Sequence, residues 1–387
     1  CCWIEGAVPV RIEDAPREMG ERVEVMNVLG AGDAFAAGLL TGLLGGKDFA
    51  GAARIANACG AVVVSRHGCA PAMPTPAELA HWFGGPRSAR VDADAQLAHL
   101  HRTTAPRQQW PQVSVLAFDH RAQMFELARA AGAPESRLPA LKRLLLAAVE
   151  EVERRGAARG IGVLIDGTYG ADALAAACGR GWWVGRPVER PGSRPLRFDG
   201  TLSLGSTLRA WPREQVVKCL VYYHPDDPAE LRVEQESRLA ELWEATRESG
   251  HELLLEVIAP PAATLPGTAD AVVLRAVKRF YNLGLKPEWW KLAPMAAESW
   301  RHLAGLVAER DPQCRGAAIL GLNQPIAALA EGFAQATDPI VKGFIVGRTL
   351  WAEPSLAWLK GTIDDATLVE RVARDFTTLC KAWEESR

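Results

Sequence analysis

VVKCLVYYHPDD, residues Val216–Asp227, is a short apolar run that carries one lysine and ends in polar turn residues. Apolar runs of this length, bounded by turn signals, are typical of strands that are buried on both faces of a parallel sheet. An amphipathic stretch, Ala229–Ser249, follows and predicts a helix. Together the two segments predict one strand–helix unit, with Lys218 as a charged residue inside the strand.

The same alternation of apolar strands and longer amphipathic helices extends over residues 112–387. Strands are expected at Val113–Phe118, Gly162–Ile165, Trp182–Val188, Val216–Tyr222, Glu252–Ile258, Trp289–Leu292, Ala317–Leu320 and Gly343–Val346. Helices are expected at Leu141–Arg155, Ala171–Cys178, Ala229–Ser249, Ala269–Leu283, Ala297–Arg310, Ile326–Ala336, Leu350–Lys360 and Ala366–Glu384. Eight such strands predict a (β/α)8 TIM barrel. Only the third unit departs from the pattern, because RPGSRPLRFDG predicts a long loop in place of a helix.

Composition excludes several classes of function. The 387 residues are 48% hydrophobic and 23% charged, with a formal net charge of −2, which is ordinary for a globular protein. This balance argues against a nucleic-acid or anionic-membrane partner, and no apolar run is long enough to span a bilayer. Eight scattered cysteines without a C-x-x-C pair predict free thiols. Without a signal peptide, we expect a cytoplasmic protein whose first residues, CCWIEG, follow a missing start.

In a (β/α)8 barrel the chemistry lies at the carboxyl ends of the strands. Charged side chains in apolar strands are costly unless they are used or paired, so these positions are candidate site residues. A ring of ion pairs that holds the barrel mouth together is the alternative. In strand order the polar residues are Asp119, His120, Arg121, Asp166, Lys218, Glu256, Lys291, Asn323 and Arg348.

Lys291 lies between Trp290 and Leu292 in a predicted strand. Desolvation there, together with the second cation Lys218, favours a neutral amine, which is the form that condenses with a ketone to an imine. A carboxylate on the adjacent strand, Glu256, could move the protons of that reaction. The pattern predicts class I aldolase chemistry without a cofactor.

Metal-dependent aldol chemistry is the main rival and needs several His or carboxylate ligands around one open position. The close pair His99 and His101 lies in the predicted linker, and His120 and His224 are too few. We therefore predict no metal site. VGRT, ahead of a helix, predicts a phosphate cradle from Gly347 and Arg348, although an ordinary strand-to-helix turn has the same pattern.

AFDHR, LIDGTYG, VVKCLVYYHPDD, LLLEVI, EWWKLAP and GRTLWAEP occur in this order. They resemble the strand ends of class I barrels of the tagatose 1,6-bisphosphate aldolase type. The resemblance implies that Lys291 forms the Schiff base, with Lys218, Glu256 and Asp119 as acid, base and electrostatic groups. The substrate and phosphate contacts that we expect are Arg121, Asp166, Asn323, Gly347 and Arg348. His120 stands where the type has a polar amide, so the substrate need not be tagatose bisphosphate.

Residues 1–83 have a different composition, and residues 84–111 predict a polar linker with one short helix. Strands are expected at AVPVRIE, RVEVM and AVVVS, and helices at Ala34–Leu44 and Phe49–Cys59. NVLGAGDAFAAG, Asn27–Gly38, and ANACGAVVVSRHGCAPAMPT resemble the last part of ribokinase-family (PfkB) sugar kinases. The resemblance implies an anion hole from Gly30, Ala31 and Gly32, Asp33 as the catalytic base and Asn57 beside the nucleotide.

Such a kinase uses ATP and Mg²⁺, but the sugar-binding half of the family lies upstream of this motif. Residues 1–83 are therefore expected to be an incomplete, C-terminal part of a ribokinase-like α/β domain, and we predict no kinase turnover from them alone. Such a remnant would expose an apolar face, so it should pack on the barrel or on a partner chain, or be poorly ordered.

A ribokinase-type kinase joined to a class I barrel resembles the bacterial fusions of inositol catabolism. This implies cleavage of 5-dehydro-2-deoxy-6-phosphogluconate to malonate semialdehyde and dihydroxyacetone phosphate. Two alternatives stay open: a kinase for 5-dehydro-2-deoxygluconate with a supporting barrel, and a non-catalytic barrel that binds a phosphosugar. The expected partners are a small phosphosugar acid and, in a homo-oligomer, further copies of the chain.

Overall fold

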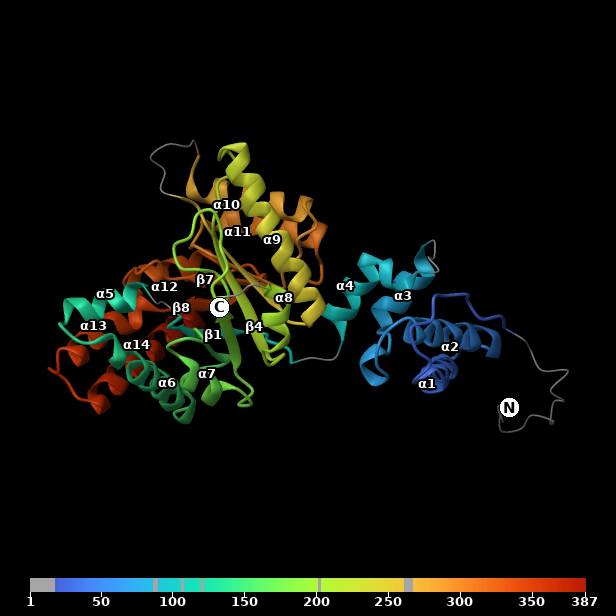
Figure 1. The fold of residues 1–387 in the computed structure, drawn as a ribbon, viewed down its shortest axis with the longest axis horizontal. Helices are drawn as coiled ribbons and strands as arrows, with labels where there is room; N and C mark the ends of the chain where they lie inside the picture. The colour runs from blue at the N-terminus through green and yellow to red at the C-terminus, as the bar shows by residue number, and fades with distance from the viewer. Residues whose placement is uncertain (1–17, 86–89, 106–107, 120–121, 201–202, 261–266) are drawn as a thin grey trace. The chain divides into compact units, whose positions relative to one another are not determined.

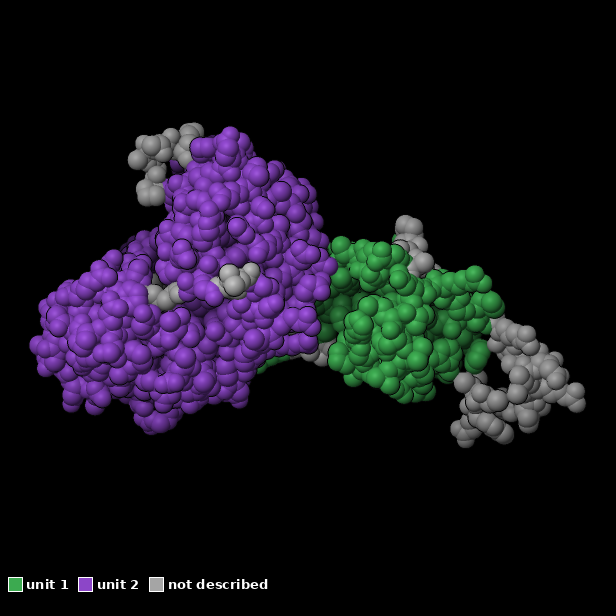
Figure 2. Space-filling model, in the orientation of Figure 1, with its two compact units in different colours: residues 1–108 green, residues 109–387 purple. Residues whose placement is uncertain are grey.

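The structure, a computed structural model, describes residues 18–85, 90–105, 108–119, 122–200, 203–260 and 267–387. The chain divides into two compact units, separated at residue 108 (Figure 2). We call them the N-terminal unit and the barrel, and describe each by itself. No helix in the described ranges is both long and apolar enough to cross a membrane.

Eight parallel strands close into a barrel in chain order, with β8 paired back onto β1 (Figure 1). The strands are β1 (Val113–Ala117), β2 (Ile161–Leu164), β3 (Trp183–Pro187), β4 (Gln215–Tyr222), β5 (Leu253–Ile258), β6 (Trp289–Leu292), β7 (Gly316–Leu320) and β8 (Val341–Val346). The predicted (β/α)8 barrel is confirmed, with strand bounds close to those expected from the apolar runs.

Helices lie between the strands and after β8. They are α5 (Ala122–Ala130), α6 (Leu138–Arg154), α7 (Ala171–Ala177), α8 (Leu204–Arg209), α9 (Ala229–Ser249), α10 (Ala269–Asn282), α11 (Ala297–Arg310), α12 (Ile326–Gln335), α13 (Arg348–Leu359) and α14 (Asp365–Glu385). α5 was not expected from the sequence. The third unit is irregular as predicted: a loop with one antiparallel bridge, Glu189 to Phe198, leads to the short helix α8.

The alternation of side chains along each strand separates two cores. Along β4, Val217 and Cys219 face the helices and belong to the large outer core, whereas Val216 faces the inside of the barrel. The inner core is filled by side chains such as Trp183 and Trp289, whose rings meet edge to face at 6.3 Å. Because these side chains fill the inside near the amino ends of the strands, open space is left at the carboxyl ends.

The N-terminal unit contains α1 (Ala31–Leu44), α2 (Phe49–Val64), α3 (Pro76–Gly84) and α4 (Ala95–Thr104). α1 and α2 pack closely through small residues. A Cβ added to Gly42 would lie 2.6 Å from the Cα of Ala52, so only glycine fits there. α4 is the short helix expected in the linker.

Two segments of this unit that were predicted to be strands are not strands in the structure. Ala61–Ser65 was expected to be a strand, but its residues form the end of α2 and its C-cap. A short buried apolar run has no period that separates the two structures, and here the helix continues through it. RVEVM, residues 22–26, is neither helix nor strand. AVPVRIE lies outside the described residues.

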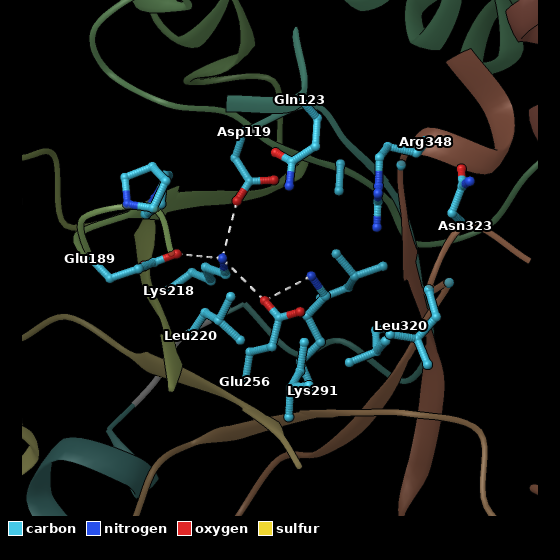
Figure 3. Close-up of a pocket in the computed structure, with 18 of the residues that line it drawn as sticks. Asp119, Gln123, Glu189, Lys218, Leu220, Glu256, Lys291, Leu320, Asn323 and Arg348 are labelled. Atoms are coloured by element: carbon cyan, nitrogen blue, oxygen red, sulfur yellow. Dashed lines mark hydrogen bonds and ion pairs between the residues drawn. The ribbon is translucent and has the colours of Figure 1, made fainter. Parts of the chain in front are cut away.

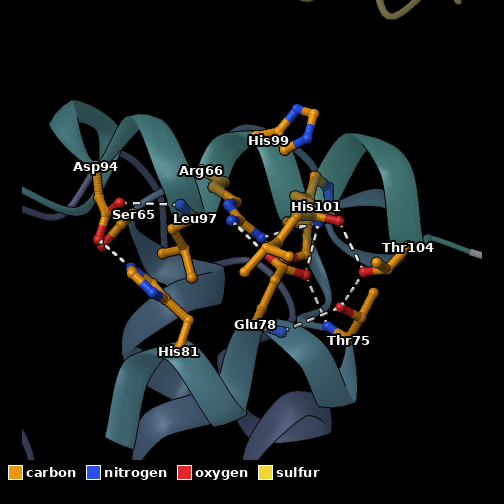
Figure 4. Close-up of polar contacts among 12 residues, drawn as sticks. Ser65, Arg66, Thr75, Glu78, His81, Asp94, Leu97, His99, His101 and Thr104 are labelled. Carbon is orange, nitrogen blue, oxygen red and sulfur yellow. Dashed lines mark hydrogen bonds and ion pairs between the residues drawn. The ribbon is translucent and has the colours of Figure 1, made fainter. Parts of the chain in front are cut away.

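A buried carboxylate, Glu78, connects the elements that follow α2 (Figure 4). Its oxygens accept hydrogen bonds from Arg66 Nη2 at 2.5 Å and from the backbone N–H of Thr75 at 2.7 Å, and His101 Nδ1 lies at 3.0 Å. Thr75 in turn caps α3, and its hydroxyl lies 2.6 Å from that of Thr104. This network attaches both α3 and α4 to the segment after α2.

Candidate active site

Three strand residues and two residues just beyond strands bring charge to the carboxyl end of the barrel (Figure 3). Lys218, Glu256 and Lys291 lie on the adjacent strands β4, β5 and β6, where Glu256 and Lys291 are paired in the register. Asp119 follows β1 and Glu189 follows β3. All five side chains are buried and line one pocket of about 210 Å³.

Lys218 is surrounded by three carboxylates. Its Nζ lies 2.6 Å from Glu189 Oε1, 3.1 Å from Glu256 Oε2 and 3.2 Å from Asp119 Oδ2. Burial alone would lower the pKa of this lysine, but the three negative charges outweigh it and raise the pKa well above its ordinary value. Lys218 is therefore an ammonium ion.

Lys291 has a different environment. Its Nζ lies 3.1 Å from Glu256 Oε2, the same oxygen that contacts Lys218. Burial works against the charge of Glu256, yet the two lysines together lower the pKa of this carboxyl. One carboxylate oxygen thus joins two amines, only one of which has further carboxylate contacts among the described residues.

Glu189 is a charged site residue that sequence reasoning missed. Burial, with Asp119 nearby, raises the pKa of its carboxyl although Lys218 opposes the shift. The signal was present, because Glu189 comes at the carboxyl end of a predicted strand like the other candidates. It also begins a proline-rich loop, so the sequence pattern alone does not distinguish Glu189 from an exposed loop residue.

The opposite wall of the pocket carries the groups expected to bind an anion. Arg348 is the first residue of α13, and its guanidinium has no hydrogen bond or ion pair within the described part of the chain. Gly347, Asn323 and Gln123 line the same wall, and Figure 3 shows Arg348 between Gln123 and Asn323. Gln123, from α5, was not expected. Asn323 and Leu322 both have positive φ angles, of 62° and 46°.

Two further predicted contacts are not among these residues. Asp166 is buried beyond β2, where it forms an ion pair with Lys142 and accepts hydrogen bonds from the N–H groups of Thr168 and Tyr169. It does not line the pocket, so the structure does not bring it to the predicted substrate contacts. Arg121 and His120 lie outside the described residues.

The predicted kinase residues lie in the N-terminal unit. Gly30 has a φ of 84° and caps α1, and Asp33 is exposed in the first turn of this helix. A Cβ on Gly30 would lie 2.5 Å from Cys69 Sγ, which explains the glycine. Ala31 and Gly32 form the same turn, whereas Asn57 is on α2 and donates a hydrogen bond to the carbonyl of Glu18 at 3.3 Å.

In the described residues, no three His, Cys, Asp or Glu side chains form a group suited to a metal ion.

Comparison with known proteins divides the chain in two. Residues 78–387 match the model of a family described as "Uncharacterized protein conserved in bacteria (DUF2090)". Residues 10–76 match the pfkB family of carbohydrate kinases. The second match confirms that the N-terminal segment is related to PfkB kinases.

Curated relatives resemble the PfkB segment. A 5-dehydro-2-deoxygluconokinase of Bacillus licheniformis is 39% identical over 66 residues, which are 17% of this chain and 20% of the relative. One of Bacillus thuringiensis is 38% identical over 58 residues, 15% of this chain and 18% of the relative. The chain thus spans about a fifth of the length of these relatives.

Among solved structures, the barrel resembles fructose-bisphosphate aldolase of Plasmodium falciparum. The likeness covers 77% of this chain and 96% of the aldolase chain, with a TM-score of 0.52 and 14% sequence identity. At this identity the likeness shows a common fold. The chain therefore combines an aldolase-like barrel with a PfkB kinase fragment.

Proposed function

The chain belongs to the DUF2090 family, and from its pocket we propose that the barrel is a class I aldolase for a phosphorylated keto acid. The observation that carries the proposal is the single oxygen, Glu256 Oε2, at 3.1 Å from both Lys218 and Lys291. An ammonium ion, a second amine and a shared carboxylate are the groups that imine formation needs. The aldolase-like fold supports the reaction class.

In the proposed reaction Lys291 is the nucleophile. Lys291 first gives one proton to the carboxylate of Glu256. The neutral Nζ then attacks the ketone carbon of the substrate, and a proton moves from the nitrogen to the carbonyl oxygen to give a carbinolamine. Glu256, 3.1 Å from Lys291, passes a proton to the departing hydroxyl group, which leaves as water. The product of this step is an iminium ion, which withdraws electrons from the neighbouring carbon–carbon bond.

Cleavage of that bond needs a base at the adjacent hydroxyl group. We assign this role to Asp119, which lines the pocket and is held 3.2 Å from Lys218. As the hydroxyl loses its proton, an aldehyde forms, and the bonding electron pair moves onto the iminium to give an enamine. Protonation of the enamine carbon and hydrolysis then release the second product and the free lysine. Lys218 offsets the negative charge that these steps move between carboxylates.

The proposed substrate is 5-dehydro-2-deoxy-6-phosphogluconate. Arg348 and the first turn of α13, with Gly347 and Asn323 beside them, suit its phosphate. The substrate choice is supported by the relatives of the N-terminal segment, which are named 5-dehydro-2-deoxygluconokinases. An imine at C5 would lead to cleavage between C3 and C4, giving malonate semialdehyde and dihydroxyacetone phosphate.

A second candidate is sugar-acid kinase activity with ATP and Mg²⁺, favoured by the same relatives. Gly30, Ala31 and Gly32 lie at the start of α1 and Asp33 lies in its first turn, and for this candidate they would bind the phosphoryl group and take the proton from the sugar hydroxyl. Because the chain spans about a fifth of these relatives, the whole activity requires further residues. ATP-dependent phosphorylation of 5-dehydro-2-deoxygluconate would test it directly.

Borohydride trapping tests the aldolase. With dihydroxyacetone phosphate and borohydride, we expect a reduced adduct on Lys291, located by peptide mass spectrometry. Lys291→Met should lose the adduct and lower the cleavage rate by more than about 10³-fold, because the nucleophile is removed. Lys360→Met, at an exposed position after α13, is the control and should behave as the unchanged protein.

Folded protein that forms no adduct on Lys291 would contradict the proposal. If the ketose phosphate binds without an adduct, the non-catalytic binding barrel becomes the better explanation.

A further inference from the structure

We propose that Glu189 is a positioning residue that holds Lys218 as an ammonium ion and so reserves imine chemistry for Lys291. The proposal rests on the aldolase function above and concerns the choice between two neighbouring amines. Neither the family description nor the relatives' names assign a role to Glu189.

Distance alone does not choose between the two lysines. Both Nζ atoms lie 3.1 Å from one oxygen of Glu256, so both can reach a carbonyl group placed above it. Both side chains are almost fully buried, with 5% and 6% of their surface exposed, so desolvation acts on both. The difference between them lies in the charges that they contact.

Glu189 supplies the shortest of the contacts to Lys218, at 2.6 Å. The other two carboxylates, Asp119 and Glu256, are assigned to proton transfers in the proposed reaction and change their charge during it. Figure 3 shows Glu189 beside Lys218 and away from Lys291. It is therefore the carboxylate that can stay paired with Lys218 while its neighbours gain and lose protons.

The backbone fixes Glu189 in this position. Pro187 and Lys218 are paired in the β3–β4 register, and the N–H of Val188 donates to the carbonyl of Lys218 at 3.0 Å. Beyond the strand, Glu189 bridges to Phe198, and the N–H of Asp199 donates to the carbonyl of Val188 at 2.9 Å. The irregular third unit of the barrel thus ends β3 in a bridged loop that keeps this carboxylate against Lys218.

The charge of Lys218 agrees with this role. Among the charged groups that raise its pKa, Glu189 acts most strongly, ahead of Glu256 and Asp119, and together they outweigh burial. Replacing the carboxylate by an amide removes one of three negative charges and leaves the size of the side chain unchanged. An opposite charge at this distance shifts a pKa by about one to three units, so the neutral fraction of Lys218 should rise at least about tenfold.

Trace reductive methylation with formaldehyde and cyanoborohydride measures this fraction without any sugar substrate. The reagent modifies neutral amines, and peptide mass spectrometry separates Lys218 from Lys291. In the unchanged protein between pH 7 and 9, we expect methylation of Lys291 and little of Lys218. In Glu189→Gln, methylation of Lys218 should increase at least about tenfold.

Two variants control for shape and stability. Glu189→Asp keeps the charge, so it should restore low methylation of Lys218 even if packing is disturbed. Glu252→Gln changes a partly buried carboxylate that contacts Arg315 and Trp289 instead of the two lysines, and should leave both lysines unchanged. Circular dichroism and thermal unfolding of each variant show whether the barrel is folded.

The proposal is overturned if folded Glu189→Gln methylates Lys218 no faster than the unchanged protein does. It is also overturned if Glu189→Asp methylates Lys218 as fast as Glu189→Gln does, because the role would then depend on shape. A parallel arm with dihydroxyacetone phosphate and borohydride tests the aldolase itself. Absence of an adduct there contradicts the proposed aldolase function. The methylation result still tests whether Glu189 keeps Lys218 protonated.

Discussion

The barrel and the N-terminal unit differ in how completely they cover their apolar side chains. Among the described residues, the barrel exposes three large apolar side chains, whereas the much shorter N-terminal unit exposes nine. In the barrel every strand pairs on both sides and every face of the sheet is packed. In the N-terminal unit, α1 packs on α2 through its small residues, but Phe35, Leu40 and Leu44 on the same helix are exposed.

The two parts also differ in the role of their buried charged groups. The barrel can bury charged groups at its mouth because the surrounding sheet is complete on all sides. The N-terminal unit has smaller hydrophobic clusters and depends on a polar network around Glu78. Three substitutions test this comparison.

The largest effect is expected from Lys142→Met in the barrel. Lys142 is fully buried on α6, where it donates to the carbonyl of Phe118 and pairs with Asp166. Removing the cation leaves the buried carboxylate of Asp166 without its ion-pair partner, which should lower the free energy of unfolding of the barrel by about 3–5 kcal/mol. Urea unfolding followed by tryptophan fluorescence measures the change.

The double variant Lys142→Met/Asp166→Leu removes both charges and should recover part of the loss. If the single variant loses less than about 1 kcal/mol, the buried pair does not support the barrel.

A smaller effect is expected from Glu78→Gln in the N-terminal unit. Burial works against the charge of Glu78, but His101, Arg66 and the Thr75 amide outweigh it and lower its pKa below the ordinary 4.5. The amide loses charge-assisted hydrogen bonds, so local stability should fall by about 1–3 kcal/mol near neutral pH. Hydrogen exchange in peptides from α3 and α4, read by mass spectrometry, measures it.

The difference in stability between the unchanged protein and Glu78→Gln should depend on pH. A carboxyl whose pKa is lowered by folding stabilises the fold above its unfolded pKa, and this contribution is lost as the pH falls through the folded value. The difference in protection between the unchanged protein and Glu78→Gln should therefore be complete above about pH 5.5 and shrink below pH 4.5. A difference that stays constant down to pH 3 would contradict the assignment.

The smallest effect on stability is expected from Leu44→Lys. Leu44 ends α1 and is 88% exposed, so little apolar burial is lost. A cation in the last turn of a helix is also favourable, and the free energy of unfolding should change by no more than about 0.5 kcal/mol. Leu145→Ala, at a fully buried position of α6, is the contrasting variant and should cost about 2–5 kcal/mol. A large loss for Leu44→Lys would show that this position is covered.

Much of the barrel could be predicted because each strand is a short apolar run followed by polar turn residues. The prediction fails where a short apolar run fits both a strand and a buried helix. Ala61–Ser65 is such a run, and its β-branched residues continue α2. The site could be predicted in part. The positions at the strand ends predicted Lys218, Glu256 and Lys291 as site residues. Sequence spacing could not show that Asp166 forms an ion pair with Lys142, 24 positions earlier on α6. Nor could it show which of the two lysines collects three carboxylates.

The network around Glu78 has a consequence for any attempt to separate the two parts of the chain. The PfkB match ends at residue 76 and the DUF2090 match begins at residue 78. A cut between them would leave Arg66 on one piece and its buried partner Glu78 on the other. α3 and α4 would then accompany the barrel while their hydrogen-bond partners stayed behind. A separation that respects the physical contacts falls after Thr104, so ancestry and packing divide this chain at different places.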